Sequence, residues 1–349
     1  MRIVVAMSGG VDSSVTAGLL AEQGHEVIGV HMKLHDADPE QAGHCCGLDD
    51  ALDARRVADR LGVPFHVIDL REAFRKAVVQ DLIDTYVAGE TPNPCVQCNG
   101  VLKFRVLLAR AMALGASHLA TGHYARIREG RLLLARDAHK DQTYFLFPIA
   151  LGALQKTLFP LGELTKSEVR VHARRFGLVT AEKAESQEIC FLPDHDHARF
   201  IQREDGRDAA GEVVDQQGRA LGRHDAYYRY TVGQRRGLGV SAAEPLYVHH
   251  VEPDTRRVVV AGRRHLLSPG LVADRWTWHE RPSPQERVTV RIRHNGRPVE
   301  GHVGAGQAPV IRFAEPAWAV APGQAVVVYR GEMVLGGGWI RSSLPAEVA

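Results

Sequence analysis

The string S-G-G-V-D-S-S at residues 8–14 carries the residue types of a phosphate-binding loop. Its two glycines let the backbone approach a phosphate without a Cβ clash, and a helix that starts there offers unpaired N–H groups and a positive dipole end. Asp12 can hold Mg²⁺ or fix the loop. The string lacks the Lys of a Walker A loop and the third glycine of a dinucleotide fingerprint. A plain tight turn at Gly9-Gly10 is the alternative interpretation.

The second group of reactive residue types is the set of five cysteines, at positions 45, 46, 95, 98 and 190. Cys95 and Cys98 form a C-x-x-C between a stiff T-P-N-P stretch and a helix expected from about residue 101. A thiol near a helix N-terminus has a lowered pKa, which suits a nucleophile or a metal ligand. One C-x-x-C without a second pair is a weak zinc signal, and Cys45 and Cys46 can be incidental or buried. The spacing alone does not bring Cys98 and Cys190 together.

Alternating strand and helix patterns predict the sheet that positions these residues. Apolar, β-branched runs predict strands at 2–7, 25–32, 64–70 and 117–122, and helical patterns fall at 11–24, 49–62, about 71–88 and about 101–114. This alternation is typical of an α/β protein with a doubly wound parallel sheet covered on both faces. Thr165 and Glu168 form a capping-box pattern, so another helix should follow and end near Gly177.

The carboxyl ends of the predicted strands indicate where a nucleotide would lie, because ligands of open α/β sheets bind beyond those ends. Residues 30–32 and 121–123 end the second and fourth strands and should flank the same nucleotide as the loop. Met32 and Gly122 are therefore candidate neighbours of its adenosine, although a Met at a strand end is more often part of the core.

The second half of the chain has a different pattern, with more turn residues and little helical periodicity. From Arg287 onward, short alternating segments such as VTVRIR, PVIRFA and AVVVYR are separated by turn signals. Such spacing predicts a small antiparallel β-barrel. We expect a catalytic domain at 1–200, a small central domain or linker at 201–270, and a C-terminal barrel at 271–349.

Composition excludes several classes of protein. The 349 residues are 45% hydrophobic and 24% charged, which is typical of a globular chain of two or three domains. No apolar run approaches the roughly 18–20 residues that span a bilayer, and the first residues lack a secretory signal. The low, odd cysteine count argues against a disulfide framework and favours a cytoplasmic location.

Charge gives a weaker signal. The net charge of +2 is no global sign of nucleic-acid binding, although every Lys or Arg position beyond residue 200 is Arg. The stretch 223–236 holds four Arg, three Tyr and one Asp, so its tyrosines could stack on bases while its arginines pair with phosphates. A solvated turn with packed tyrosines is the alternative.

Seven motifs in one order resemble the bacterial tRNA-specific 2-thiouridylases of the MnmA type, in the PP-loop ATP pyrophosphatase superfamily. They are S-G-G-V-D-S-S, T-P-N-P-x-x-x-C-N, A-T-G-H-Y-A, K-D-Q-T-Y-F-L, S-Q-E-I-C-F, Y-T-V-G-Q-R-R-G-L-G and L-G-G-G-W-I, and they cover essentially the whole chain. The resemblance implies a PP-loop domain, a small central domain and a C-terminal antiparallel β-barrel.

The implied reaction replaces O2 of the wobble uridine, position 34, with sulfur in tRNAs with Lys, Glu and Gln acceptors. ATP with Mg²⁺ would adenylate that oxygen, because an unactivated amide-like oxygen is a poor leaving group. Cys98 takes the place of the nucleophile, and Cys190 takes the place of the cysteine that receives sulfur as a persulfide. A transient disulfide between the two would then need a reductant. A persulfide sulfur-relay protein or a sulfide donor is implied as a partner, and neither DNA nor a membrane is.

The resemblance also implies binding residues. Those for ATP are Ala6, Met7, Ser8, Gly9, Gly10, Val11, Asp12, Ser13, Met32 and Gly122. Those for tRNA are Asn93, Pro94, Cys95, His123, Lys140, Asp141, Gln142, Arg293, His294 and Gln324. The barrel matches are weaker, since many relatives have Arg-Tyr where this chain has Arg293-His294.

One departure matters for the chemistry. Many relatives have Asp where this chain has Cys95, so three thiols, Cys95, Cys98 and Cys190, can ligate a [4Fe–4S] cluster with one open iron position. Such a cluster would deliver sulfide and would compete with the persulfide mechanism. Two other functions stay open: a PP-loop enzyme with a small-molecule acceptor, and a non-catalytic RNA-binding or metal-storage protein.

Overall fold

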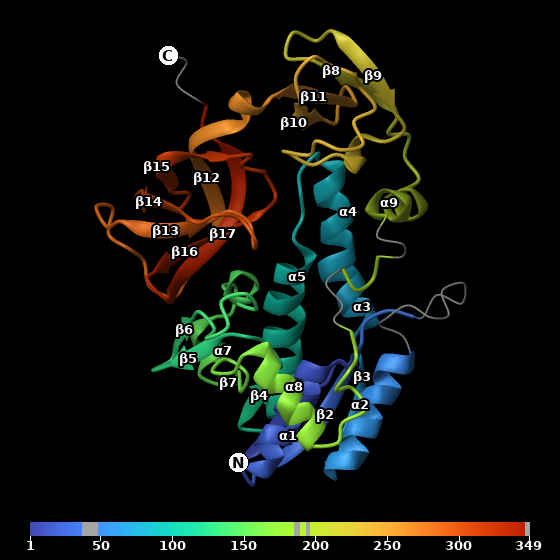
Figure 1. The fold of residues 1–349 in the computed structure, drawn as a ribbon, viewed down its shortest axis with the longest axis vertical. Coiled ribbons are helices and arrows are strands. Elements are labelled where there is room, and N and C mark those ends of the chain that lie inside the picture. The colour runs from blue at the N-terminus through green and yellow to red at the C-terminus, as the bar shows by residue number, and fades with distance from the viewer. Residues whose placement is uncertain (37–47, 185–188, 193–195, 346–349) are drawn as a thin grey trace. The chain divides into compact units, whose positions relative to one another are not determined.

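The computed structural model describes residues 1–36, 48–184, 189–192 and 196–345, so Cys45 and Cys46 lie outside the described residues. The chain forms two compact units (Figure 1). Unit 1 comprises Met1–Val78, Cys95–Phe191 and Glu332–Val334. Unit 2 comprises Val79–Pro94, Leu192–Gly331 and Leu335–Ala349.

Unit 1 is built on a five-stranded parallel sheet with the strand order β3-β2-β1-β4-β7. Its strands are β1 (Arg2–Ala6), β2 (Glu26–Lys33), β3 (Phe65–Asp69), β4 (His118–Ala120) and β7 (Thr157–Leu158). The central strand β1 buries four consecutive residues, as expected for a strand covered on both faces. A short hairpin of β5 (Arg126–Arg128) and β6 (Arg131–Leu133) also belongs to unit 1, and Met333 pairs with Leu133 there.

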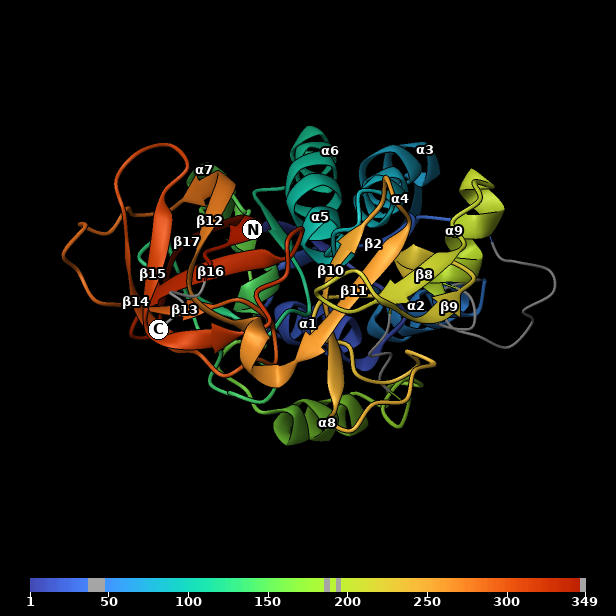
Figure 2. The ribbon, with the colours of Figure 1, turned by 90° about the horizontal axis from the view of Figure 1, so that it is seen from above.

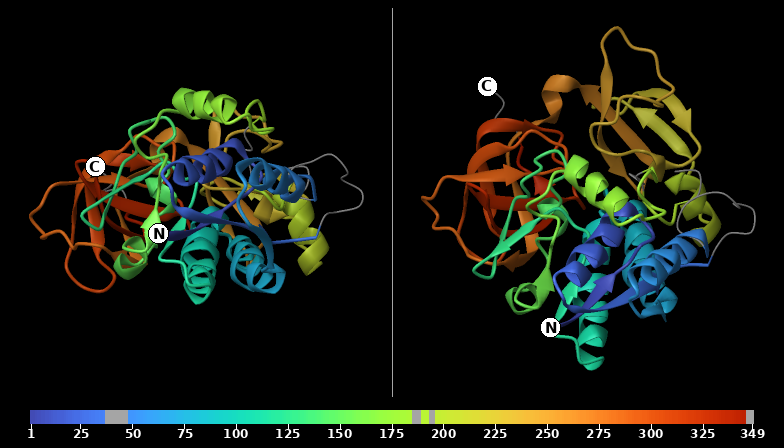
Figure 3. Two further views of the ribbon diagram at one scale, coloured as in Figure 1. Left: turned by 90° about the horizontal axis from the view of Figure 1, so that it is seen from below. Right: turned by 60° about the horizontal axis from the view of Figure 1, so that its bottom comes forward.

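Helices cover both faces of this sheet. Figure 3 shows α1 (Val11–Glu22), α2 (Leu48–Leu61) and α8 (Lys166–Arg175) on one face, and the teal run of η3 (Cys98–Leu107) and α6 (Leu108–Ala113) on the other. The predicted doubly wound α/β sheet is therefore confirmed. The other helical segments of this part of the chain are α3 (Arg71–Phe74), η2 (Arg75–Val79), α4 (Gln80–Val87), α5 (Pro94–Gln97), η4 (Thr143–Phe145) and α7 (Leu151–Leu154).

The helix α8 forms where the capping-box pattern predicts it. The Thr165 hydroxyl accepts a hydrogen bond from the Glu168 N–H, and the Glu168 carboxylate accepts one from the Thr165 N–H. The helix packs on α1 at a point of close approach. A Cβ at Gly18 would lie 2.7 Å from the Phe176 ring, so only glycine leaves room for this contact.

Unit 2 contains a four-stranded sheet with the order β10-β11-β8-β9 (Figure 2). Its strands are β8 (Gly211–Val214), β9 (Ala220–His224), β10 (Leu246–Glu252) and β11 (Arg257–Gly262). The helix α9 (His197–Asp205) and the short segments η6 (Tyr227–Arg229) and η7 (Arg263–Leu266) accompany it along the chain. The helix α9 begins at Asp196, whose carboxylate accepts from the Arg199 N–H.

The C-terminal strands form the predicted antiparallel barrel. The strand order β12-β15-β14-β13-β16-β17 closes through a pairing of β12 with β17. The strands are β12 (Leu267–Trp278), β13 (Val288–Arg291), β14 (Val299–Val303), β15 (Val310–Trp318), β16 (Ala325–Arg330) and β17 (Met333–Ser343). Closure gives β12 a hydrogen-bonded partner on each side, β15 and β17.

No helix in residues 1–36, 48–184, 189–192 or 196–345 is both long and apolar enough to cross a membrane. The domain boundaries expected near residues 200 and 270 remain predictions. The two compact units of the structure follow other boundaries, because each unit is made of separate stretches of the chain.

Candidate functional site

The predicted phosphate loop lies between β1 and α1. Gly9 has φ +80°, and a Cβ there would lie 2.3 Å from the Asp50 carbonyl oxygen, so this position requires glycine. The Ser13 hydroxyl accepts from the Ser8 N–H at 3.1 Å, which holds the loop against the first turn of α1. Gly10 is the N-cap of α1 and makes no side-chain cap, so the N–H groups of this turn lack the usual side-chain acceptor. Such a turn is suited to an anion.

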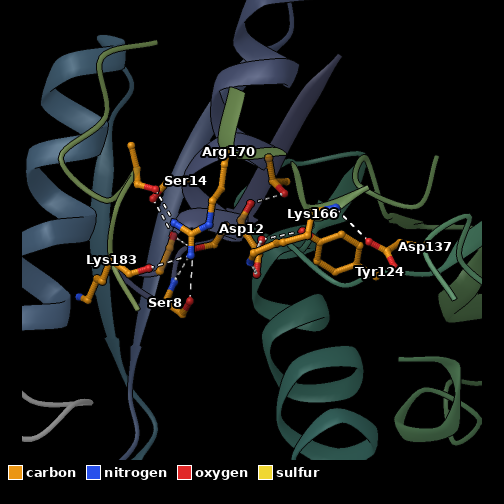
Figure 4. A network of polar contacts seen from close by, with 12 residues as sticks. Ser8, Asp12, Ser14, Tyr124, Asp137, Lys166, Arg170 and Lys183 are labelled. Carbon is orange, nitrogen blue, oxygen red and sulfur yellow. Dashed lines mark hydrogen bonds and ion pairs between the residues drawn. The ribbon is translucent and has the colours of Figure 1, made fainter. Parts of the chain in front are cut away.

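A cation lies beside the one carboxylate of this loop (Figure 4). Lys166 Nζ is 2.7 Å and 2.8 Å from the two carboxylate oxygens of Asp12, and the Tyr124 hydroxyl donates to Asp12 at 2.9 Å. Lys166 begins α8, and its N–H donates to Asp137. The sequence analysis interpreted this stretch only as a capping box, because a lysine at a helix start gives no sign of what it meets in the fold.

A second lysine, Lys183, contacts the phosphate loop and lies in the stretch that precedes Cys190 in sequence. Lys183 Nζ donates to the Gly9 carbonyl at 3.1 Å, to Asp50 at 2.7 Å and to Asp53 at 2.6 Å. Arg170 in α8 donates to the carbonyl oxygens of Ala181 and Lys183, which holds this stretch in place. Neither Lys166 nor Lys183 could be assigned to the loop from the sequence, since neither lies in a recognisable phosphate motif.

The other residues expected beside the nucleotide follow the strand ends. β2 and β4 flank β1 in the sheet, as the topology prediction requires. A Cβ at Gly122 would lie 2.7 Å from the Ser13 N and 2.8 Å from the Asp12 carbonyl carbon, so Gly122 packs directly on the first turn of α1. Met32 is half-buried and pairs with Ile68 across β2 and β3. Its role beside adenosine remains a prediction.

The structure brings the three described cysteines of unit 1 into one electrostatic neighbourhood, which their spacing did not predict. All three are free thiols. Burial raises the pKa of the Cys98 thiol, the positive charge of Lys103 lowers it, and the negative charge of Cys190 raises it. Desolvation also raises the pKa of Cys95, although its side chain is exposed to water, and the charges of Cys190, Lys103 and Cys98 act on it.

This neighbourhood does not fit an iron–sulfur cluster. Among the described residues, which include all three thiols, no three His, Cys, Asp or Glu side chains are grouped so that they could hold a metal ion. The expectation that Cys95, Cys98 and Cys190 ligate a [4Fe–4S] cluster is therefore not supported, because the three thiols lack this grouping.

Several residues expected to contact tRNA have partners within unit 1. His123 lies between Lys103 and Thr121, with ring nitrogens 3.4 Å from Lys103 Nζ and 2.7 Å from the Thr121 hydroxyl. Asp141 is buried and accepts from the Ala135 N–H and the Thr143 hydroxyl. Gln142 accepts from the Tyr124 N–H, while Lys140 is half-buried. These contacts give each residue a structural role beside the predicted one.

Unit 2 brings together two predicted tRNA contacts that are far apart in sequence. The Asn93 amide donates to the Gln324 side-chain oxygen at 3.3 Å, and the Gln324 amide donates to the Pro92 carbonyl at 2.9 Å. Pro94 is buried at the end of this stretch. The loop before Cys95 is thereby tied to the start of β16.

Arg293 and His294 lie in the barrel after β13. The Arg293 guanidinium donates to the carbonyl oxygens of Val232 and Ala319 and lies 5.7 Å from the centre of the Trp318 ring. His294 is half-buried. The expectation that the tyrosines of 223–236 stack on bases is wrong, because Tyr227, Tyr228 and Tyr230 are all buried in the core of unit 2.

Comparison with protein families matches three models along the chain. The model described as "tRNA methyl transferase HUP domain" matches residues 1–194. Those described as "tRNA methyl transferase PRC-barrel domain" and "Aminomethyltransferase beta-barrel domain" match residues 198–262 and 268–340. The first alone covers more than half of the chain.

Similar curated proteins match from end to end. A protein of Geobacter metallireducens is 51% identical over 98% of this chain and 97% of its own length. One of Geotalea uraniireducens is 48% identical over 100% of this chain and 97% of its own, and one of Carboxydothermus hydrogenoformans is 45% identical over 98% of each. Each carries the name tRNA-specific 2-thiouridylase MnmA.

Proposed function

The chain belongs to the tRNA-specific 2-thiouridylase family, and we propose that it is a tRNA-uridine 2-sulfurtransferase that replaces O2 of the wobble uridine with sulfur. The proposal rests on one observation. The phosphate loop with its two lysines belongs to unit 1, and so does the Cys95–Cys98–Cys190 neighbourhood. An activating nucleotide and a sulfur carrier are the two parts that this chemistry needs.

The first step activates the base. O2 of the uracil attacks the α-phosphorus of ATP, a P–O bond forms, and pyrophosphate leaves with the electrons of the broken bond. The loop N–H groups and Lys166 would neutralise phosphate charge, and Asp12 is the loop carboxylate suited to the Mg²⁺ that accompanies ATP. Residues 6–13, Met32 and Gly122 form the proposed ATP site.

The second step transfers sulfur. The terminal sulfur of a persulfide on Cys190 attacks C2, and AMP leaves with the electrons of the C2–O2 bond. The Cys98 thiolate then attacks the Cys190 sulfur, which releases the base with its C2–S bond and leaves a Cys98–Cys190 disulfide. A dithiol reductant restores both thiols. A persulfide sulfur-relay protein would reload Cys190, and reducing cytoplasm is the compartment we propose.

The tRNA would contact both units. In unit 1 we propose Cys95, His123, Lys140, Asp141 and Gln142, and in unit 2 Asn93, Pro94, Arg293, His294 and Gln324. The proposed substrates are tRNAs with Lys, Glu and Gln acceptors. We retain 201–270 as a central domain and 271–349 as the barrel in this proposal.

Pyrophosphate release tests the first step separately from the second. We expect pyrophosphate to form from ATP only when unmodified tRNA is present. C98S should retain this release and lose thiolation, because its serine cannot break the sulfur link to Cys190. Release at the same rate without tRNA, or only with a small-molecule acceptor, would contradict the proposal.

A further inference from the structure

The C-x-x-C lies at the start of a helix in which α5 runs directly into the π-helical segment η3, and this segment contains both Cys98 and Lys103. A π-helix bonds residue i to residue i+5, so side chains five residues apart lie one turn above each other. Two pairs of buried residues in this segment have this separation: Asn99 with Phe104, and Leu102 with Leu107. Cys98 and Lys103 form a third pair, and both are half-buried.

The Lys103 ammonium lies beside His123. Lys103 Nζ lies 3.4 Å from His123 Nε2, and His123 Nδ1 lies 2.7 Å from the Thr121 hydroxyl. An ammonium can only donate, so Nε2 accepts, Nδ1 carries the ring proton and the Thr121 oxygen accepts it. The rings of Phe104 and Phe159 flank His123, with centroids 5.8 Å and 5.9 Å away.

His123 is suited to this role because it stays neutral. Burial lowers its pKa well below the ordinary value, and the positive charge of Lys103 lowers it further. A neutral imidazole fixes the lysine without neutralising its charge. The positive charge of Lys103 therefore remains available to Cys98, where it opposes the effect of burial on the thiolate.

We propose that Lys103 is the positioning cation of the thiol site, held by His123 so that its ammonium stabilises negative charge on the Cys98 sulfur. This inference rests on the proposed function, in which Cys98 must become a thiolate before it can attack the Cys190 sulfur. Among the described residues, Lys103 supplies positive charge at Cys98 and Cys190 supplies negative charge. The Lys103 charge reduces the rise that burial causes in the pKa of Cys98 and does not cancel it.

The test measures how fast iodoacetamide alkylates Cys98, read by mass spectrometry of the peptide that contains it, without ATP or tRNA. Only the thiolate reacts, so the rate follows the thiolate fraction. We expect K103M to slow alkylation roughly ten-fold near neutral pH, the effect of about one pKa unit, and to move the rate profile to higher pH. K103R, which keeps the charge, should stay close to wild type.

Lys156→Met is the matched control, because Lys156 is an exposed lysine of the same unit. It should leave the profile unchanged. An unchanged Cys98 profile in a folded K103M protein, judged by circular dichroism, would overturn the inference, and K103Q provides the same comparison if K103M does not fold. Because alkylation needs no substrate, the inference can fail while thiolation is observed, and it can hold if the tRNA substrate is wrong.

Discussion

Lys166 Nζ lies 2.7 Å and 2.8 Å from the two oxygens of the Asp12 carboxylate, inside the loop that follows β1. The two side chains come from helices 154 residues apart along the chain. Lys166 is 13% exposed and Asp12 is 32% exposed, so water screens their interaction only partly. An anion that enters this loop would meet a neutral pair with Lys166 in place, and an uncompensated carboxylate without it.

We therefore expect K166M to weaken ATP binding. The loss of one charged hydrogen-bond donor beside the loop is worth about 1.5–3 kcal/mol, or roughly a 10- to 100-fold higher Kd. AMP should bind nearly as in wild type, because it carries less phosphate charge. Calorimetric titration of both nucleotides checks this, with K156M as the exposed-lysine control. Equal loss of ATP and AMP affinity would mean that K166M disturbs the whole site.

Gly122 provides a steric test of the predicted ATP site. In G122A the new methyl would lie 2.7 Å from the Ser13 N and 2.8 Å from the Asp12 carbonyl carbon, so the backbone of the first turn of α1 must move. We expect ATP affinity to fall at least about ten-fold, or roughly 1.4 kcal/mol. Gly152→Ala is the matched control, since a Cβ there has no atom within 4 Å among the described residues. Normal ATP binding by G122A would place the nucleotide elsewhere.

Lys183 should contribute to stability in a pH-dependent way. Burial lowers its pKa, but hydrogen bonds to Asp50 and Asp53 outweigh burial and raise it overall. K183M should lower the free energy of unfolding by about 1–3 kcal/mol, because it removes a charged donor from two largely buried carboxylates, of which Asp53 retains its contact with Arg56. Urea unfolding, again beside K156M, measures this difference.

The sign of the pH effect follows from the raised pKa. The contribution of Lys183 is fully present below the pKa of an unfolded lysine, about 10.4, and is lost as the pH rises through the folded value. The gap between wild type and K183M should therefore stay constant near neutral pH and narrow above about pH 10. A gap that widens in that range would contradict this role of the ammonium.

Substitution of Arg293 tests whether this residue stabilises the barrel or binds RNA. R293M removes the donor for the carbonyl oxygens of Val232 and Ala319, so we expect unit 2 to lose about 1–3 kcal/mol of stability. R297M, at an exposed position of the same turn, should not change the melting temperature. If R293M loses tRNA affinity with its melting temperature unchanged, Arg293 acts on RNA rather than on the fold.

The sequence predicted the parts of the fold that local patterns determine. The first strand, the start of α1 after the loop, the capped α8 and the strand β16 at Ala325–Arg330 all fall where the patterns indicate. The helix expected over 71–88 is present as an unbroken run from Arg71 to Val87, with the π-helical segment η2 between α3 and α4. The helix expected from about residue 101 begins earlier, at Pro94 in α5, and becomes π-helical at Cys98. A five-residue period is too rare to be expected from sequence.

The site was less accessible to prediction. Lys103, Lys166 and Lys183 are ordinary lysines in the sequence, and only the tertiary fold brings them to His123, Asp12 and Gly9. Conversely, Tyr228 lies in a stretch typical of RNA contacts but is buried, because composition does not reveal which face of a segment points inward. Motifs locate chemistry along the chain, and long-range packing decides its partners.

The most direct test of the whole account is nucleoside analysis of unmodified tRNA after anaerobic incubation with the protein, ATP–Mg²⁺ and a persulfide donor. We predict 2-thiouridine with wild type, and none with C98S or C190S. A parallel reaction with sulfide in place of persulfide tests whether Cys190 must carry the sulfur. If no 2-thiouridine forms with either donor while ATP is still converted to AMP and pyrophosphate, the tRNA thiolation claim is contradicted.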